Sequence, residues 1–175
     1  DLDDLLRAMD QPSIDGVNTY FVAKAAAAEG LKVAISGLGG DELFAGYDSF
    51  SQIPALVGGL GAIPGIGGIG RVLRALSAPL AGTVLSPKAP GLFEYASGFG
   101  DAYLLRRALF MPWELAQVMD ADMAREGLAI LNARGRLDAC QAKIKAPKAK
   151  VAALEMAWYM RNQLLRDADW AGMAH

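Results

Sequence analysis

The sequence predicts an α/β fold in which helix dominates, and two observations carry that prediction. First, the apolar run Leu31–Ile35 leads into a glycine-rich turn and then an acidic, helix-forming segment. Strand, glycine turn and helix in this order are typical of a doubly wound α/β unit, where ligands bind at the carboxyl ends of strands. Second, strand signals largely stop after Tyr47 and helical spacing takes over. We therefore expect one partial domain, with a strand–turn–helix unit over residues 1–50 and a helical part over residues 51–175.

Composition excludes several classes of protein. A chain of 175 residues is long enough for one domain with a core. Its net charge of −2 does not suggest a nucleic-acid-binding surface. One cysteine and one histidine permit neither an internal disulfide framework nor a Cys/His zinc site. The lone cysteine is typical of a reducing, cytoplasmic protein, and the abrupt ends predict a piece excised from a longer chain.

The first elements follow from their end signals. Asp10–Ser13 is a turn, and a helix begins after it with Ser13 or Asp15 as its N-cap. Gly30 ends that helix. Leu31–Ile35, short and partly β-branched, is then expected to be a buried parallel strand.

The uncharged run of residues 53–70 has the length of a membrane span. Its seven glycines and two prolines weaken any helix there. We expect a small helix and a mobile loop, and no membrane span. Contact of this run with a partner protein or a lipid surface stays open as an alternative.

Helical spacing continues to the end of the chain. The predicted helices cover Arg71–Leu80, Ala102–Leu109, a segment from Pro112 through Trp113 to Met119, Asp122 to about Ala133, and Val151–Arg166. The last is the longest, with Val151, Leu154, Trp158 and Leu165 on one stripe. At the end of this helix, Arg166 and Asp167 are expected either to form an exposed ion pair or to lie near a ligand-binding site.

The glycine turn, residues 36–41, is the candidate site for a phosphorylated ligand. It comprises Ser36, Gly37, Leu38, Gly39, Gly40 and Asp41. Backbone N–H groups at a helix start and the Ser36 hydroxyl suit phosphate, and the glycines permit close approach. Asp41 and Glu42 would repel a bare phosphate, so Mg²⁺ bridging Asp41 and the phosphate is the simplest resolution. The alternative is a tight turn capped by Asp41. No lysine follows the glycines, so this is not a Walker A loop.

Three ordered motifs resemble the glutamine-hydrolysing asparagine synthetases. Ser36–Tyr47 resembles the family signature Ser-Gly-x-Gly-x-Asp-Glu-x-Phe-x-Gly-Tyr. Asp10–Ser13 resembles the Asp-(Glu/Gln)-Pro segment upstream of that signature. Tyr159–His175 resembles the segment that ends in Asp-x-x-(Ser/Gly)-Met-Ala-His, which Asp169 and Gly172–His175 match.

The resemblance implies an adenine-nucleotide α-hydrolase-like (PP-loop) synthetase domain. Such a domain uses ATP and Mg²⁺ to adenylate the side-chain carboxylate of aspartate. Ammonia, released from glutamine by a separate N-terminal glutaminase domain, then attacks the adenylate to give asparagine. Ser36, Gly37 and Asp41 match family positions around AMP and pyrophosphate, with Asp41 the magnesium position. No catalytic residue is assigned, and a homodimer of the parent protein stays open.

Missing and altered residues limit what the chain is expected to do. The family's Ser-Gly-Gly-x-Asp-Ser pyrophosphate loop and N-terminal cysteine nucleophile are absent from these residues. We therefore expect the chain alone to be inactive. Leu38 stands where well-known members carry Glu, and no arginine for aspartate lies around Ile14 and Asp15. A related ligase acting on another carboxylate, as β-lactam synthetases do, stays open, and so does a non-catalytic interaction module.

Overall fold

The computed structural model describes residues 2–77 and 88–175 and divides them into two compact units. The first unit joins the residues up to Gly46 to Glu155–His175, and the second unit is Tyr47–Leu154. The predicted helical predominance is confirmed in both.

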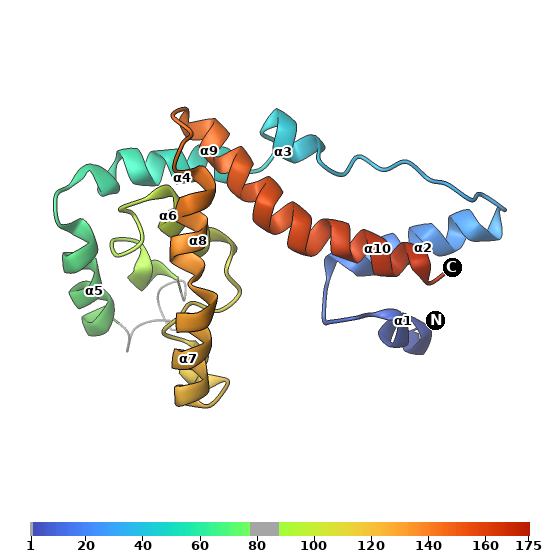
Figure 1. Cartoon of the computed structure of the whole chain (residues 1–175), viewed down its shortest axis with the longest axis horizontal. Helices are drawn as coiled ribbons and strands as arrows, with labels where there is room; N and C mark the ends of the chain where they lie inside the picture. The colour runs from blue at the N-terminus through green and yellow to red at the C-terminus, as the bar shows by residue number, and fades with distance from the viewer. Residues whose placement is uncertain (1, 78–87) are drawn as a thin grey trace. The chain divides into compact units, whose positions relative to one another are not determined.

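The first unit is built on two long helices that lie side by side (Figure 1). Its elements are α1 (Leu2–Ala8), α2 (Asp15–Ala28), α3 (Gly40–Phe44), the π-helix η5 (Glu155–Leu164) and α10 (Leu165–Met173). Helix α2 packs on α10, and Leu5, Tyr20, Trp170 and Ala171 form the core. Gly16 is required there, because a Cβ at this position would lie 2.2 Å from Cζ2 of Trp170.

The predicted boundaries of α2 are close to those in the structure. The N-cap residue is Ile14, without a side-chain cap, and not the predicted Ser13 or Asp15. The Ser13 hydroxyl oxygen accepts a hydrogen bond from the Gly16 N–H at 3.5 Å, just inside the helix. Gly30 follows the helix with φ +73°, the left-handed conformation that glycine adopts without steric cost.

The second unit is a helical assembly around a separate core. Its elements are α4 (Ser49–Gly58), the 3₁₀ turn η1 (Leu60–Ala62), α5 (Ile66–Ser77), the 3₁₀ turns η3 (Ala89–Gly91) and η4 (Leu115–Gln117), α6 (Phe99–Arg107), α7 (Ala121–Leu131), α8 (Ala133–Gln141) and α9 (Pro147–Leu154). Helix α6 packs against α4, α8 and α9. Tyr95, Leu105 and Met111 form one buried cluster of this core.

The predicted strand Leu31–Ile35 does not form. These residues are an irregular connection between α2 and α3, with Val33 80% and Ile35 98% exposed. A strand gains its hydrogen bonds from neighbouring strands, and none of residues 2–77 and 88–175 is in a strand. The local signal was β-like, but the described residues offer no partner for it.

The glycine-rich run of residues 53–70 holds more helix than the expected small helix and loop, with turns at residue 59 and residues 63–65 between the helical pieces. After α4, the chain continues as η1 and α5. A Cβ on Gly61 would lie 2.2 Å from the carbonyl oxygen of Ala96, and one on Gly70 would lie 2.2 Å from the backbone nitrogen of Glu94. These two glycines therefore let the backbone of residues 94–96 pass close to η1 and α5.

Among the described residues, no single helix has both the length and the apolar character to cross a bilayer. Only Ser49–Ala62 and Ile66–Leu76 taken together reach that threshold, and they are bent by 100° relative to each other.

Two other helix predictions need correction. The expected helix from Pro112 to Met119 is reduced to η4, because its N–H groups bond three residues back, as Gln117 does to the Glu114 carbonyl at 2.9 Å. Helix α5 begins at Ile66, before the predicted Arg71, and predicted residues 78–80 lie outside the described residues. By contrast, α6 and α7 lie close to their predicted ranges.

The predicted long helix Val151–Arg166 changes its hydrogen-bonding pattern within its length. Val151 and Leu154 are fully buried in α9, as the stripe predicts. The chain then becomes the π-helix η5, whose i→i+5 bonds take more residues per turn and rotate the following side chains off the α-helical stripe. Leu165, predicted on the buried stripe, is accordingly 46% exposed.

Candidate functional site

The glycine turn of residues 36–41 leads into α3, a helix of one turn with a left-handed residue at each end. Gly39 (φ +91°) precedes α3, and Ala45 (φ +61°) follows it. The Gly40 N–H donates to the Gly37 carbonyl at 3.1 Å, and the Leu43 N–H donates to the Gly39 carbonyl at 3.1 Å. The turn therefore has a defined backbone conformation, and the φ angle at position 39 is the one that favours glycine.

Solvent reaches most of the predicted site residues. Ser36, Gly37, Leu38 and Asp41 are exposed, and Gly39 and Gly40 are half-buried. The Ser36 hydroxyl oxygen accepts a hydrogen bond from the Leu38 N–H at 3.4 Å. Glu42, in contrast, is only 1% exposed. Of the two acids that the sequence placed beside the phosphate, only Asp41 faces solvent.

Packing among the described residues does not explain Gly37 and Gly40. Neither has a positive φ, and a Cβ added to either would meet no atom within 4 Å. Gly39 differs, because it has a left-handed φ and its Cβ would lie 3.6 Å from Sδ of Met160 in η5. The open side of residues 37–40 therefore has room for the close approach of a ligand.

Helix α3 is too short for its dipole to contribute much to phosphate binding, as the sequence had suggested it would. A helix of five residues has few aligned peptide dipoles, so its macrodipole contributes little to anion binding. Any affinity of the turn for phosphate must then come from its N–H groups, from the Ser36 hydroxyl and from a cation held by Asp41.

The acidic side chains of the described residues could hold a metal ion only if a bound substrate supplied further oxygen ligands. Within residues 2–77 and 88–175, no group of three or more His, Cys, Asp or Glu side chains is placed to hold a metal ion. Mg²⁺ in nucleotide sites commonly takes one or two carboxylates, with phosphate oxygens and water completing its octahedron. A single exposed carboxylate at Asp41 fits that second pattern.

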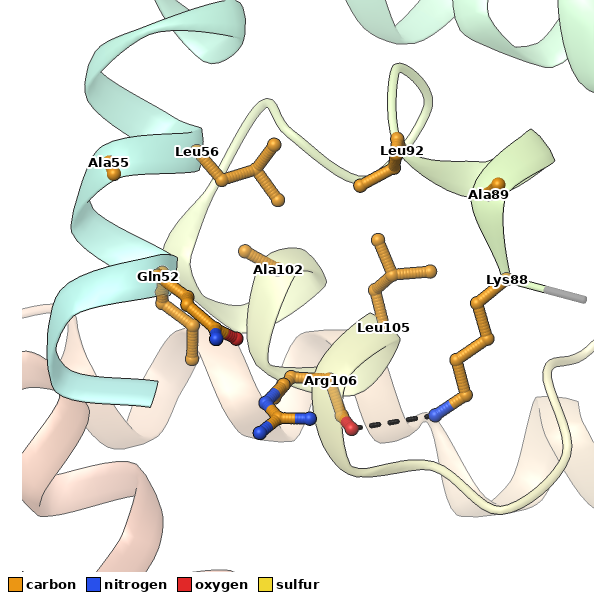
Figure 2. A pocket seen from close by; sticks show the side chains of 10 residues that line it. Gln52, Ala55, Leu56, Lys88, Ala89, Leu92, Ala102, Leu105 and Arg106 are labelled. Carbon is orange, nitrogen blue, oxygen red and sulfur yellow. Dashed lines mark hydrogen bonds between the residues drawn. The ribbon is translucent and has the colours of Figure 1, made fainter. Parts of the chain in front are cut away.

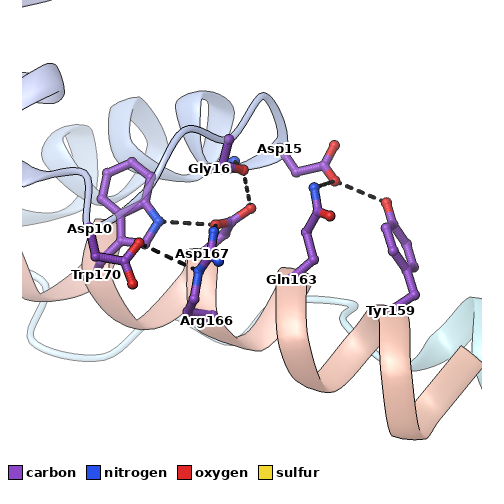
Figure 3. A network of polar contacts seen from close by, with 9 residues as sticks. Asp10, Asp15, Gly16, Tyr159, Gln163, Arg166, Asp167 and Trp170 are labelled. Carbon is purple, nitrogen blue, oxygen red and sulfur yellow. Dashed lines mark hydrogen bonds and ion pairs between the residues drawn. The ribbon is translucent and has the colours of Figure 1, made fainter. Parts of the chain in front are cut away.

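A buried carboxylate joins the N-terminal motif to the C-terminal motif within the first unit (Figure 3). Asp167, 1% exposed, accepts hydrogen bonds from the Ser13 hydroxyl, from Nε1 of Trp170 at 3.0 Å and from Nη2 of Arg166 at 3.0 Å. Nε of Arg166 also lies 3.4 Å from Oδ1 of Asp10. The reading of Asp167 as part of an exposed ion pair is therefore wrong, because its carboxylate is an internal anchor.

Asp15 makes a second link between the same segments. Its Oδ2 accepts hydrogen bonds from the Tyr159 hydroxyl at 2.9 Å and from Nε2 of Gln163 at 3.0 Å (Figure 3). Both donors are on η5, the helix that also contacts α3. Sequence reasoning gave Asp15 only a capping role and missed Gln163, since no local pattern pairs residues 148 positions apart.

The three motifs singled out in the sequence therefore share one unit. Residues 10–16 are bonded to η5 and α10, and the glycine turn rests on η5 through Gly39 and α3.

Comparison with known proteins gives one match. The sequence model of the family described as asparagine synthase matches residues 1–175, the whole chain. No curated protein and no solved structure shows a significant match to the chain.

Proposed function

The chain belongs to the asparagine synthase family, and we propose that it supplies one half of the ATP site of a carbon–nitrogen ligase. The family is one of ATP-dependent ligases of the asparagine-synthesis type. The proposed half-site is the glycine turn, Ser36–Asp41. Its complement is a second phosphate-binding loop of the Ser-Gly-Gly-x-Asp-Ser type, which these 175 residues do not contain.

Each residue of the turn has a proposed role. The Ser36 hydroxyl and the backbone N–H groups of Gly37 and Gly39 bind phosphate oxygens of ATP, whereas the N–H groups of Leu38 and Gly40 donate within the turn. Gly37 and Gly40 keep that face free of side chains, so that the backbone comes within hydrogen-bonding distance of the ligand. The Asp41 carboxylate holds Mg²⁺, which neutralises charge on the pyrophosphate leaving group when bound. Leu38 contributes through its backbone.

One observation supports this proposal more than any other: Gly37 and Gly40 are demanded neither by backbone conformation nor by packing within the described chain. A turn that serves only to connect α2 to α3 needs glycine at position 39 alone. The two further glycines, beside an exposed serine and an exposed aspartate, suit close approach by a ligand.

The proposed acceptor is the side-chain carboxylate of aspartate, which ammonia derived from glutamine converts to the amide of asparagine. A second acceptor, another carboxylate as in β-lactam synthetases, is favoured by two departures. Leu38 replaces the family's Glu, and Asp15 stands in the region where an arginine for aspartate is expected. Arg166, a cation of the first unit, is paired with Asp10 and Asp167.

Titration of the 175-residue chain with ATP, in the presence and absence of Mg²⁺, tests the half-site. We expect Mg²⁺ to strengthen ATP binding. We expect Asp41→Asn to weaken Mg²⁺-dependent binding roughly tenfold, the loss that about 1.4 kcal/mol of one charge-assisted contact gives. Glu126→Gln, at an exposed position of α7, is the matched control and should leave binding unchanged. Equal effects of the two substitutions would exclude Asp41 as the magnesium ligand.

ATP–pyrophosphate exchange tests the rest of the proposal. With Mg²⁺ and aspartate, the chain alone should catalyse no exchange, because half a site cannot orient the carboxylate for in-line attack on the α-phosphorus. Exchange by the isolated chain would show that residues 1–175 hold a complete site.

A further inference from the structure

A pocket of about 640 Å³ lies in the second unit, whereas the glycine turn belongs to the first unit. It is formed by α4, α6 and the segment that begins at Lys88. Its apolar wall is aliphatic and includes Ile53, Leu56, Leu92 and Leu105, of which Ile53 and Leu105 are buried. A concave, mostly aliphatic site of this volume is within the range of small-molecule pockets.

Two cations lie at one side of this pocket. Figure 2 shows the Lys88 ammonium and the Arg106 guanidinium on the same side, and the side chains of Leu56 and Leu92 on the opposite side. Nζ of Lys88 donates to the carbonyl oxygens of Arg106, at 3.4 Å, and Ala108, at the C-terminal end of α6. An ammonium has three N–H donors, so one remains for a ligand.

The positive charge at this side is only partly compensated. Burial, and then the charge of Arg106, lower the pKa of Lys88, while the carboxylate of Glu114 raises it. Nη2 of Arg106 lies 4.0 Å from Oδ2 of Asp48, and both side chains are largely exposed, so this ion pair contributes little. A further negative group between Lys88 and Arg106 would relieve their mutual repulsion.

We propose that this pocket binds a monocarboxylate with an aliphatic body, such as a medium-chain acyl carboxylate. The carboxylate accepts hydrogen bonds from the Lys88 ammonium and the Arg106 guanidinium, and such charge-assisted bonds are about twice as strong as neutral ones. The aliphatic body covers Leu56, Leu92 and Leu105 and removes their apolar surface from water. One negative charge matches the partly compensated cation pair, whereas a neutral or cationic head group does not.

Octanoate, 1-octanol and octylammonium are matched probes for this proposal, because they share the aliphatic body and differ in the head group. Titrated into the 175-residue chain and followed by calorimetry or amide chemical shifts, octanoate should bind saturably. The alcohol should bind about tenfold more weakly, the equivalent of one charge-assisted contact, and the amine more weakly still. Octanol binding as tightly as octanoate, or no saturable octanoate binding up to about 1 mM, would overturn the proposal.

Two arginine variants make the test specific to the pocket. Arg106→Gln should weaken octanoate binding by roughly five- to tenfold and leave the chain folded, because this side chain is 47% exposed. Arg125→Gln removes an exposed arginine of α7 and should leave binding unchanged. Equal losses in the two variants would show unspecific charge attraction and contradict the assigned site. Asp41→Asn, in the glycine turn, should leave octanoate affinity unchanged, so failure here is separable from failure of the proposed ATP site.

Discussion

Asp167 is the residue whose role differs most from the expectation set by its chemistry. A carboxylate that is 1% exposed would carry a large desolvation cost if it stood alone. Ser13, Trp170 and Arg166 offset that cost by donating to it from two segments far apart in sequence. The Asp167 carboxylate therefore joins the start of α2 to α10. Tyr20 of α2 and Trp170 of α10 belong to the core of the first unit.

Replacing Asp167 by Ala should destabilise the first unit by roughly 3 kcal/mol, because the buried Trp170 indole and the half-buried Ser13 and Arg166 side chains lose their acceptor. Amide hydrogen exchange in α2 and α10 measures this as lost protection. Asp169→Ala, two residues along the same helix at an exposed position, is the control and should change stability by less than about 0.5 kcal/mol. Equal loss of protection in the two variants would mean that the Asp167 contacts contribute no special stability.

The three glycines of the turn should respond differently to alanine. Gly39→Ala should cost about 1–2 kcal/mol, because its φ of +91° is unfavourable for a residue with a Cβ. Gly37→Ala and Gly40→Ala should leave stability unchanged or raise it by up to about 1 kcal/mol, and yet weaken Mg²⁺-dependent ATP binding several-fold. Urea unfolding and ATP titration measure the two effects, and unaltered ATP binding in both variants would remove the main support for a ligand at this face.

At the scale of elements, the sequence predicted helix ends well where they depend on residues close by in the chain. Gly30 ends α2 as predicted, although the N-cap of α2 is Ile14 and not Ser13 or Asp15. Helix α7 begins one residue before the predicted Asp122, with Asp120 as its N-cap. Signals that depend on distant partners failed. Leu31–Ile35 has the composition of a strand, but the described residues contain no neighbouring strand. The π-helix η5 has no periodic sequence pattern that distinguishes it from an α-helix.

The candidate site also divides into features that depend on neighbouring residues and features that depend on residues distant in the sequence. Its glycine turn could be found from the sequence, because glycines beside an acid and a serine are local chemistry. The burial of Glu42 could not, nor could the bonds of Asp15 to Tyr159 and Gln163, because these depend on how α3 and α2 rest on η5.

Asp138, an exposed residue of α8, has its carboxyl against Gly100 of α6. Burial, and then the charge of Asp101, raise the pKa of Asp138 above its ordinary value of 3.8, although Arg134 and a hydrogen bond to Gln141 oppose the shift. A carboxyl with a raised pKa in the folded state favours folding at low pH. That contribution is lost as the pH rises through the folded-state pKa.

Asp138→Asn should therefore raise the melting temperature at pH 7, and this gain should fade as the pH falls toward 3.8. Thermal unfolding followed by circular dichroism at a series of pH values measures it. Asp122→Asn, which alters an exposed acid of α7, is the control and should give no such pH-dependent gain. A gain for Asp138→Asn that is constant from pH 4 to pH 7 would contradict a raised pKa at this position.

At the scale of the whole molecule, the chain assembles its family motifs from both ends. Residues up to Gly46 and residues from Glu155 onward form one compact unit, although the whole second unit lies between them in the sequence. The glycine turn, the Asp10–Ser13 segment and the segment from Tyr159 onward thereby become neighbours on η5 and α10. The family match covers all 175 residues, and the glycine turn of the proposed half-site is supported by η5 from the C-terminal part of the chain.

The central claim is that the turn Ser36–Asp41 binds the phosphates of a magnesium nucleotide. The most direct test is a residue-resolved one: ¹H–¹⁵N spectra of the chain recorded during titration with Mg²⁺ and pyrophosphate. We predict saturable shifts centred on the amides of residues 36–41, strongly reduced in Asp41→Asn and retained in Glu126→Gln. Shifts centred elsewhere in the chain, or shifts at the turn that Asp41→Asn leaves unaltered, would contradict it.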